Sequence, residues 1–225
     1  MKRAVIIVAG GKGLRMGTEV PKQFLPLDGV PVLCRTVSRF LEYDPEIAVI
    51  LALPENHIGV WKTLSAPYFP SDRCTVVVGG KERYHSVKNA LSCVSDDVDL
   101  TAVHDGVRPL AGVQMIARAF TEAALKGNAV PCIAPPESIR FEDSDGGNNR
   151  PLDRRCVKLI QTPQVFSTKI LKEAYQIPYC EGFTDDASVV EKYGEKIFLV
   201  DGEKQNIKIT TYEDLSYAEF LLRKK

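Results

Sequence analysis

The chain has 225 residues, of which 44% are hydrophobic and 26% charged, the composition of a globular protein with a buried core. Its 29 lysines and arginines balance 29 aspartates and glutamates. Proteins that bind nucleic acid or anionic membranes over a broad surface usually carry a basic excess, so any anion site here is local. No apolar run approaches the ~18 residues that a membrane span needs. We expect a cytoplasmic protein with no nucleic-acid or membrane partner.

Strand-like and helix-like segments alternate as far as residue 134. Apolar runs at 4–9 and 47–53, typical of strands buried on both faces, predict two strands, and the segments 75–80, 99–105 and 128–134 are also predicted to be strands. Apolar residues at helical spacing predict helices at 31–43, 82–94 and 113–127. This alternation predicts an α/β fold with a mostly parallel, twisted sheet and helices on both faces. The loops that follow the strands then share one edge, where such folds bind ligands.

The alternation breaks between Pro135 and Val165. Two extended segments, 138–143 and 154–162, flank the turn-forming tip SDGGNNRP. This arm, at about 136–160, is either a solvated hairpin or, given its arginines, an extension that reaches a partner subunit. Beyond it, the pattern predicts helices at 167–176, 185–193 and 212–224, and strands at 196–201 and 206–210. We expect one domain over residues 1–225.

The segment AGGKGLRMGTEVPKQF (9–24) joins glycines and cations directly after the first strand. It is not a Walker A loop, because Lys12 is not followed by Ser or Thr. It is not a dinucleotide fingerprint, because Met16 takes the place of the third glycine and a proline soon interrupts any helix. The glycines alone are compatible with a tight turn. Arg15 and Lys22 in the same loop favour phosphate binding.

Five further segments follow in chain order: GGKERYHSV (79–87), HDGVRP (104–109), TPQVF (162–166), TDDAS (184–188) and NIKIT (206–210). Together with the first loop, they resemble the 2-C-methyl-D-erythritol 4-phosphate cytidylyltransferase family of sugar-phosphate nucleotidyltransferases over nearly the whole chain. The resemblance implies a Rossmann-like nucleotidyltransferase domain with a protruding β-arm that forms a homodimer. It implies an enzyme of the non-mevalonate isoprenoid pathway that joins CTP to 2-C-methyl-D-erythritol 4-phosphate, giving 4-diphosphocytidyl-2-C-methyl-D-erythritol and pyrophosphate.

In that reaction a phosphate oxygen of the sugar-alcohol phosphate attacks the α-phosphorus of CTP. This oxygen is already ionised near neutral pH, so the protein has to supply alignment and positive charge rather than a base. Arg15 and Lys22 suit this role, and the resemblance assigns the matching cations to the transition state. It also implies that Lys208 and Arg154 hold the sugar phosphate, with Arg154 coming from the arm of the other protomer.

The resemblance and the residue chemistry together give two sets of binding residues. The nucleotide set is Ala9, Gly10, Gly11, Gly13, Gly80, Ser86 and Asp105. The acceptor set is Asp105, Arg108, Ser138, Arg154, Thr162, Thr184 and Lys208.

Several of these residues have an ordinary structural explanation as well. Asp105 also suits a cap of the following turn, Arg108 a surface salt bridge, and Ser86 a helix start. Lys208, which alternates with two isoleucines, also suits plain solvent exposure. Thr184 lies in TDDAS, which is a good helix N-cap sequence. Position 81 holds a lysine where the family often has an acid, so we expect no ribose contact there.

Magnesium is the expected cofactor. It prefers oxygen ligands and keeps several waters, so we expect the CTP phosphates to hold most of it, with Asp105 contacting it through a water. The histidines and the six cysteines show no metal-ligand spacing, and no structural zinc is expected.

Three alternative functions stay open at this point. A ribitol 5-phosphate cytidylyltransferase shares most of the segments and differs in the acceptor. A dinucleotide-dependent oxidoreductase is disfavoured by the missing third glycine. A non-catalytic nucleotide-binding protein would use the same loop, but it needs fewer cations than Arg15, Lys22 and Lys208 provide.

Overall fold

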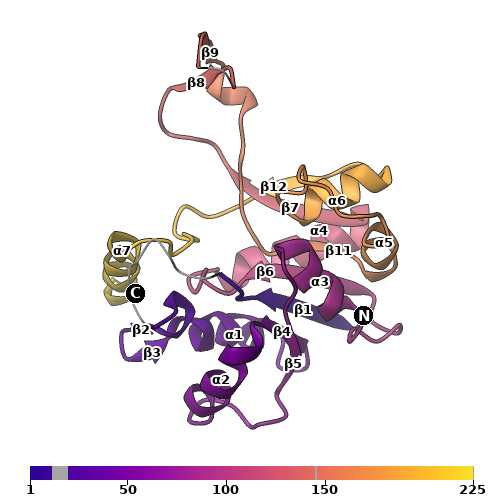
Figure 1. Ribbon diagram of the computed structural model, residues 1–225, viewed down its shortest axis with the longest axis vertical. Coiled ribbons are helices and arrows are strands. Elements are labelled where there is room, and N and C mark those ends of the chain that lie inside the picture. The colour runs from indigo at the N-terminus through magenta and orange to yellow at the C-terminus, as the bar shows by residue number, and fades with distance from the viewer. Residues whose placement is uncertain (12–19, 145, 225) are drawn as a thin grey trace.

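The computed structural model describes residues 1–11, 20–144 and 146–224. Four parallel strands form one half of the central sheet: β1 (Arg3–Val8), β4 (Ala48–Leu53), β5 (Cys74–Val78) and β6 (Leu100–Asp105). The other half is mixed and contains β7 (Asn128–Ile133), β10 (Leu159–Ile160), β11 (Gln164–Ser167) and β12 (Leu199–Asp201). The strand order is β10-β7-β11-β6-β1-β4-β5, with β12 paired to β7 (Figure 1). The prediction of a mostly parallel α/β sheet is confirmed.

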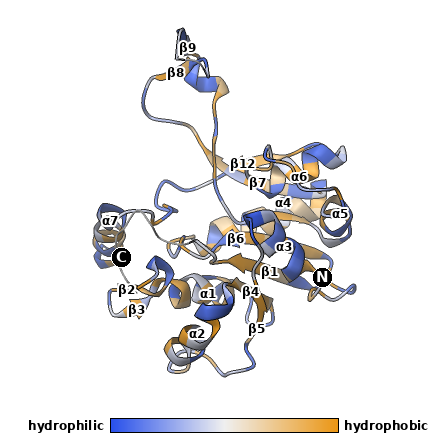
Figure 2. Ribbon diagram, viewed as in Figure 1, coloured by the Kyte–Doolittle hydropathy of each residue, from blue (hydrophilic) through white to orange (hydrophobic). Residues whose placement is uncertain are grey.

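Helices cover both faces of this sheet. Val5 and Ile7 of β1 point into one apolar cluster with α1 (Val32–Tyr43), α2 (Ile58–Ser65) and α4 (Val113–Lys126). Ala4 and Ile6 point into the opposite cluster with α3 (Arg83–Leu91), α5 (Thr168–Ala174) and α6 (Asp186–Tyr193). This alternation explains the uninterrupted apolar sequence of β1, since both of its faces are buried. Figure 2 shows the hydrophobic residues gathered in the central strands.

The predicted helix boundaries rest on recognisable end signals. α4 ends at Gly127, whose φ of 89° is a left-handed conformation that glycine adopts without strain. α6 begins at Asp185, whose side chain accepts a hydrogen bond from the backbone N–H of Ser188 in a capping box. The last helix, α7 (Tyr212–Arg223), packs against a third apolar cluster near the first loop.

The arm extends away from the sheet (Figure 1). Its two strands are β8 (Ile139–Glu142) and β9 (Asn149–Leu152), which pair antiparallel. The second strand therefore lies within the sequence that we predicted to be the tip. Residues 154–156, predicted to be extended, form the 3-10 helix η4 (Arg154–Cys156), which Asp153 caps through the N–H of Arg155. The aspartate favours a capped turn over a strand at this point.

Three other local features differ from the predictions. Residues 206–210 form an extended loop without strand pairing, because Ile209 donates to the carbonyl of Val107 in a turn rather than to a strand. α2 and β11 were not predicted. The remaining short elements are β2 (Pro26–Leu27), β3 (Val30–Pro31) and the 3-10 helices η2 (Lys22–Phe24) and η3 (Glu55–His57). In the described ranges, no helix combines the length and the apolar character that crossing a membrane requires.

His104, one residue before the end of β6, is completely buried. Its Nε2 lies 3.2 Å from the carbonyl of Arg108, and its Nδ1 lies 2.9 Å from the hydroxyl of Thr162. A carbonyl only accepts, so Nε2 carries the proton and Nδ1 accepts from Thr162. Desolvation lowers the pKa of His104 to about 4. This histidine is therefore a neutral core residue.

We expect the burial of His104 to make the protein less stable as the pH falls from about 6.5 to about 4. Over that range the unfolded chain binds a proton at this histidine and the folded chain does not. The resulting loss is about 3 kcal/mol, the linkage value for a pKa that moves from about 6.5 to about 4. Urea unfolding at several pH values measures it. In His104→Gln the free energy of unfolding should depend less on pH, and an unchanged slope would contradict the assignment.

Candidate active site

A cleft of about 930 Å³ lies at the carboxyl ends of β1, β4, β5 and β6. Its walls come from the loops that follow these strands, as expected for a parallel sheet. The lining residues used below are Gly10, Gly11, Lys22, Gln23, Gly80, Arg83, Ser86, Asp105 and Lys208. Residues distant in the sequence thus meet at one edge of the sheet.

Asp105 occupies the end of β6 and is 7% exposed. Its Oδ2 lies 3.1 Å from Nζ of Lys208 and 3.2 Å from Nε of Arg108. Its Oδ1 lies 3.7 Å from Nε of Arg83. Burial by itself would raise the pKa of Asp105, but these three cations hold that pKa well below its ordinary value. The carboxylate is therefore ionised whenever the protein is folded near neutral pH.

Arg83, at the first turn of α3, is fixed from the side away from the cleft. Its Nη1 and Nη2 lie 2.9 and 2.6 Å from the two oxygens of Asp186, which is completely buried. The hydroxyl of Tyr175 donates to the same carboxylate at 2.7 Å. Two-pronged pairing of this kind fixes the direction of a guanidinium as well as its position. Arg83 was not among the predicted site residues, because an arginine at the start of a helix has no distinctive signal in the sequence.

Gly80 and Ser86 meet at the end of β5. The backbone N–H of Gly80 donates to the hydroxyl of Ser86 at 3.0 Å, and that hydroxyl also bonds to the carbonyl of Glu82. A Cβ at Gly80 would collide with the Cβ of His85, so this close turn requires glycine. The predicted nucleotide residues Gly80 and Ser86 are thus neighbours that close one end of the cleft.

Lys22 lies in η2 and lines the cleft together with Gly80. A Cβ added to Gly11 would lie 3.9 Å from Cε of Lys22, so the lysine side chain runs beside Gly11. The neighbouring Gln23 is 1% exposed, and its amide donates to the carbonyl of Ala9 at 2.9 Å. This bond ties η2 to the end of β1. No role was predicted for Gln23 from the sequence, because only the folded chain shows that its amide binds the carbonyl of Ala9.

Lys208 reaches the cleft from an extended loop, and its side chain is 45% exposed. The loop is anchored by Asn206, whose amide donates to the carbonyl of Thr162 at 2.8 Å and whose carbonyl accepts from Arg108 at 2.7 Å. Ile209, the neighbour of Lys208, is completely buried. The prediction that this lysine points away from the apolar side is confirmed, although the loop is not a strand.

Two predicted acceptor residues face inward. Arg108 is 12% exposed and bonds to Asp105 and to the carbonyl of Asn206. The hydroxyl of Thr162 accepts from the N–H of Asp105 at 3.0 Å and bonds to His104. Both residues therefore hold Asp105 in place.

The other predicted residues lie elsewhere. Thr184 is exposed just before the cap of α6. Ser138 is exposed on the arm, and Arg154 donates to the carbonyl of Pro136 at the arm base, beside a groove of about 620 Å³. Within one protomer, neither Ser138 nor Arg154 lines the cleft described above. Gly13 and Arg15 lie outside the described residues.

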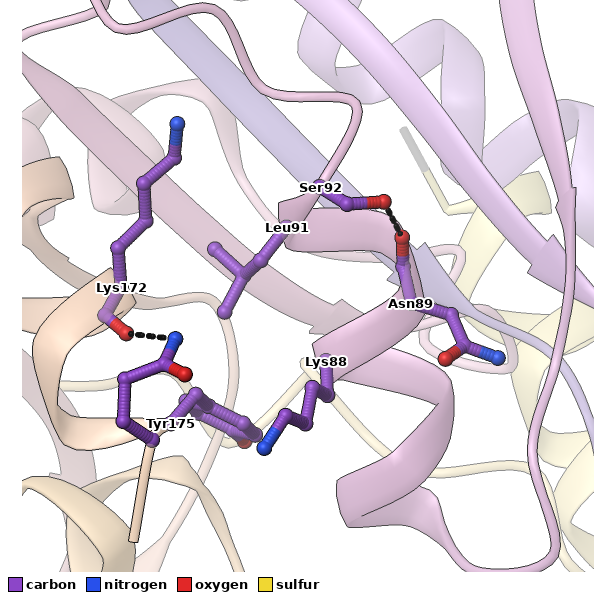
Figure 3. A pocket seen from close by; sticks show the side chains of 7 residues that line it. Lys88, Asn89, Leu91, Ser92, Lys172 and Tyr175 are labelled. Atoms are coloured by element: carbon purple, nitrogen blue, oxygen red, sulfur yellow. Dashed lines mark hydrogen bonds between the residues drawn. The ribbon is translucent and has the colours of Figure 1, made fainter.

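A separate groove of about 390 Å³ lies between α3 and the end of α5. Figure 3 shows its side chains, with Lys88 and Asn89 on one side and Lys172 and Tyr175 on the other. Lys172 is committed to the carbonyl of Val94 and to Asp96. None of the predicted site residues lines this groove, so it does not belong to the active-site cleft.

Comparison with known proteins shows the family. The family model for 2-C-methyl-D-erythritol 4-phosphate cytidylyltransferase matches residues 3–224. Proteins of that name from Phocaeicola vulgatus and Porphyromonas gingivalis are each 47% identical to this chain. The first alignment covers 99% of this chain and 100% of the relative, and the second covers 98% of each.

Solved structures give the same result. The 4-diphosphocytidyl-2C-methyl-D-erythritol synthase from Anaerococcus prevotii superposes with a TM-score of 0.83 at 27% identity, covering 99% of this chain and 98% of that one. The 2-C-methyl-D-erythritol 4-phosphate cytidylyltransferase from Thermus thermophilus gives 0.76 at 29% identity, covering 99% and 100%. The predicted Rossmann-like fold and the predicted family are confirmed, and the oxidoreductase and non-catalytic alternatives are set aside. The chain belongs to the 2-C-methyl-D-erythritol 4-phosphate cytidylyltransferase family, and it is a nucleotidyltransferase of isoprenoid biosynthesis.

Proposed function

We propose that the cleft joins CTP to 2-C-methyl-D-erythritol 4-phosphate, giving 4-diphosphocytidyl-2-C-methyl-D-erythritol and pyrophosphate. The observation that carries this proposal is the arrangement of the cleft, which combines a backbone-rich end at Gly80 and Ser86 with the cations Lys22 and Lys208. A nucleotide needs both features, one for its base and one for its phosphates. The names of the relatives, at 44–47% identity, support this substrate pair.

The cations act on the phosphate being transferred. An ionised phosphate oxygen of the acceptor forms a bond to the α-phosphorus, and the bond from that phosphorus to the oxygen bridging to the β-phosphate breaks. Pyrophosphate leaves with the electron pair. Lys22, together with Arg15 from the same loop, stabilises the charge that builds up on the α-phosphate oxygens. The backbone of Ala9, Gly10, Gly11 and Gly13 wraps the triphosphate.

The acceptor lies near Asp105 and Lys208. Lys208 binds the phosphate of the sugar alcohol, and Asp105 accepts a hydrogen bond from one of its hydroxyls. Arg108 and Thr162 serve the acceptor through Asp105, because Nε of Arg108 donates to its carboxylate and the hydroxyl of Thr162 accepts from its backbone N–H. Thr184, which is exposed just before the cap of α6, is a further hydroxyl contact of the acceptor in this proposal.

The protein is a homodimer in this proposal. Residues 1–225 form one domain, and the arm at about 136–160 carries Ser138 and Arg154 to the acceptor site of the partner. Exposed apolar side chains on the arm support this, since Phe141 is 43% and Leu152 37% exposed. The composition and the unpaired thiols of all six cysteines, which are all described, fit a cytoplasmic location.

Magnesium would be held at this site mainly by the nucleotide. No three His, Cys, Asp or Glu side chains in the described ranges are grouped closely enough to hold a metal ion. The charge of Asp105 is already balanced by cations, so it suits contact through a water. The triphosphate oxygens would hold the ion, which supplies positive charge to the leaving pyrophosphate.

Release of pyrophosphate tests the proposed function. Purified protein with CTP, magnesium and 2-C-methyl-D-erythritol 4-phosphate should release pyrophosphate and form the cytidine diphosphate product, detected by phosphorus NMR. Ribitol 5-phosphate, assayed in parallel, should react with a far lower kcat/KM. Equal reactivity would favour the ribitol enzyme, and no release with either acceptor would refute the proposal.

Lys22→Ala tests the transition-state role. We expect kcat to fall about 100-fold or more, as for the loss of a group that stabilises developing charge, while the KM for CTP changes little. Lys62→Ala, on the exposed side of α2, is the matched control and should behave as wild type. A raised KM with an unchanged kcat would mean that Lys22 only binds the ground state.

Mixing two inactive variants tests the shared site. Arg154→Ala and Lys22→Ala protomers should each have low activity alone. After subunit exchange, the mixture should regain about a quarter of wild-type activity, because half of the dimers are hybrids with one intact site of two. Native mass spectrometry verifies that exchange has occurred. Hybrids without recovered activity would place Arg154 in the site of its own chain.

A further inference from the structure

Asp186 carries a buried negative charge that the proposed reaction does not use. Its side chain is completely buried at the first turn of α6, and it does not line the cleft. Both of its oxygens bind Arg83, at 2.9 and 2.6 Å, and Tyr175 donates to one of them. Tyr175 is itself buried and stacks on Tyr84 with ring centroids 4.8 Å apart. The side chain of Asp186 is therefore held in one position by its burial and its hydrogen bonds.

The guanidinium of Arg83 lies between two carboxylates but divides its contacts unequally. Asp186 takes both terminal nitrogens at hydrogen-bond distance, and the nearest contact with Asp105 is the one from Nε, at 3.7 Å from its Oδ1. The other oxygen of Asp105, Oδ2, is already contacted by Arg108 and Lys208. Among the described residues, Oδ1 accepts no hydrogen bond, whereas Oδ2 accepts one from Nε of Arg108. It is consequently the oxygen of Asp105 with capacity left for a hydroxyl of a ligand in the cleft.

We propose that Asp186 is a positioning residue which, by holding both terminal nitrogens of Arg83, stops that arginine from closing a two-pronged ion pair on Asp105. Oδ1 of Asp105 then stays available to the acceptor. This inference rests on the proposed function, in which Asp105 accepts a hydrogen bond from the acceptor.

The physical argument is competition for one guanidinium. A half-buried arginine that loses a charged partner turns to the nearest remaining carboxylate, since an unpaired charge in this environment is costly. Arg83 is 28% exposed, and Asp105 is the other carboxylate in reach. A fork on Asp105 would use Oδ1 and draw the carboxylate away from Lys208. The ion pair of Arg83 with Asp186 therefore has a structural role, and it leaves Asp105 free to bind the acceptor.

Asp186→Asn tests this directly in the full-length protein. It keeps the shape of the side chain and removes its charge. We expect the KM for the acceptor to rise about tenfold or more, the usual cost of losing a hydrogen bond to a charged group, while the KM for CTP changes little. A crystal structure of the variant should show Arg83 within 3.2 Å of both Asp105 oxygens. Asp185→Asn is the matched control, because asparagine also caps helices and residue 185 does not bind Arg83; its acceptor KM should stay at the wild-type value.

A double variant, Arg83→Met with Asp186→Leu, distinguishes two explanations of a raised acceptor KM: a new ion pair of Arg83 with Asp105, or a general disturbance of the fold. Replacing a buried ion pair with apolar side chains is often tolerated, so we expect an acceptor KM within about threefold of wild type. This expectation stands even if Asp186→Asn does not fold. An acceptor KM raised tenfold in the double variant would overturn the proposal, as would an unchanged acceptor KM in Asp186→Asn. If the wild type is inactive, the proposed function fails, and the position of Arg83 in the Asp186→Asn crystal structure still decides this inference.

Discussion

The carboxylate of Asp105 is the group on which the charge arrangement of the cleft depends. It faces cations from three separate segments, with Arg83 on α3, Arg108 in the following turn and Lys208 in a distant loop. One buried negative charge thus brings together positive groups that would otherwise repel one another. The cleft can therefore present cations to phosphates while the protein around it stays electrostatically balanced.

Neighbouring polar residues of the fold hold Asp105 and its partners in place. Thr162, which precedes β11, accepts from the N–H of Asp105 and contacts His104 in the core. Asn206 fastens the loop of Lys208 to the same segment and to Arg108. Residues that were predicted from sequence motifs to contact the substrate can therefore act indirectly, by holding another residue that contacts it. Arg108 and Thr162 are examples, since their polar groups are used by the protein itself.

The two ends of the cleft are held to different degrees. Gly80 and Ser86 are fixed by the hydrogen bond between them, in a turn that has no room for a side chain at position 80. Lys208, in contrast, is 45% exposed and reaches the cleft with a flexible side chain. A rigid end suits recognition of a planar base. A mobile cation suits a phosphate that has to enter and leave.

The sequence by itself determined most of the sheet, most of its helices and the family, because apolar periodicity and turn residues are local and the motif segments are short and ordered. It missed α2 and β11. It also selected Lys22, Asp105 and Lys208 as site residues, and all three line the cleft. Tertiary structure alone decided which polar groups pair. The contacts of Arg83 with Asp186 span 103 positions of sequence, and no local pattern encodes such a partner. The inward direction of Thr162 and the two hydrogen bonds of Arg108 were likewise set by packing, because a side chain's partners are fixed only when distant segments are brought together.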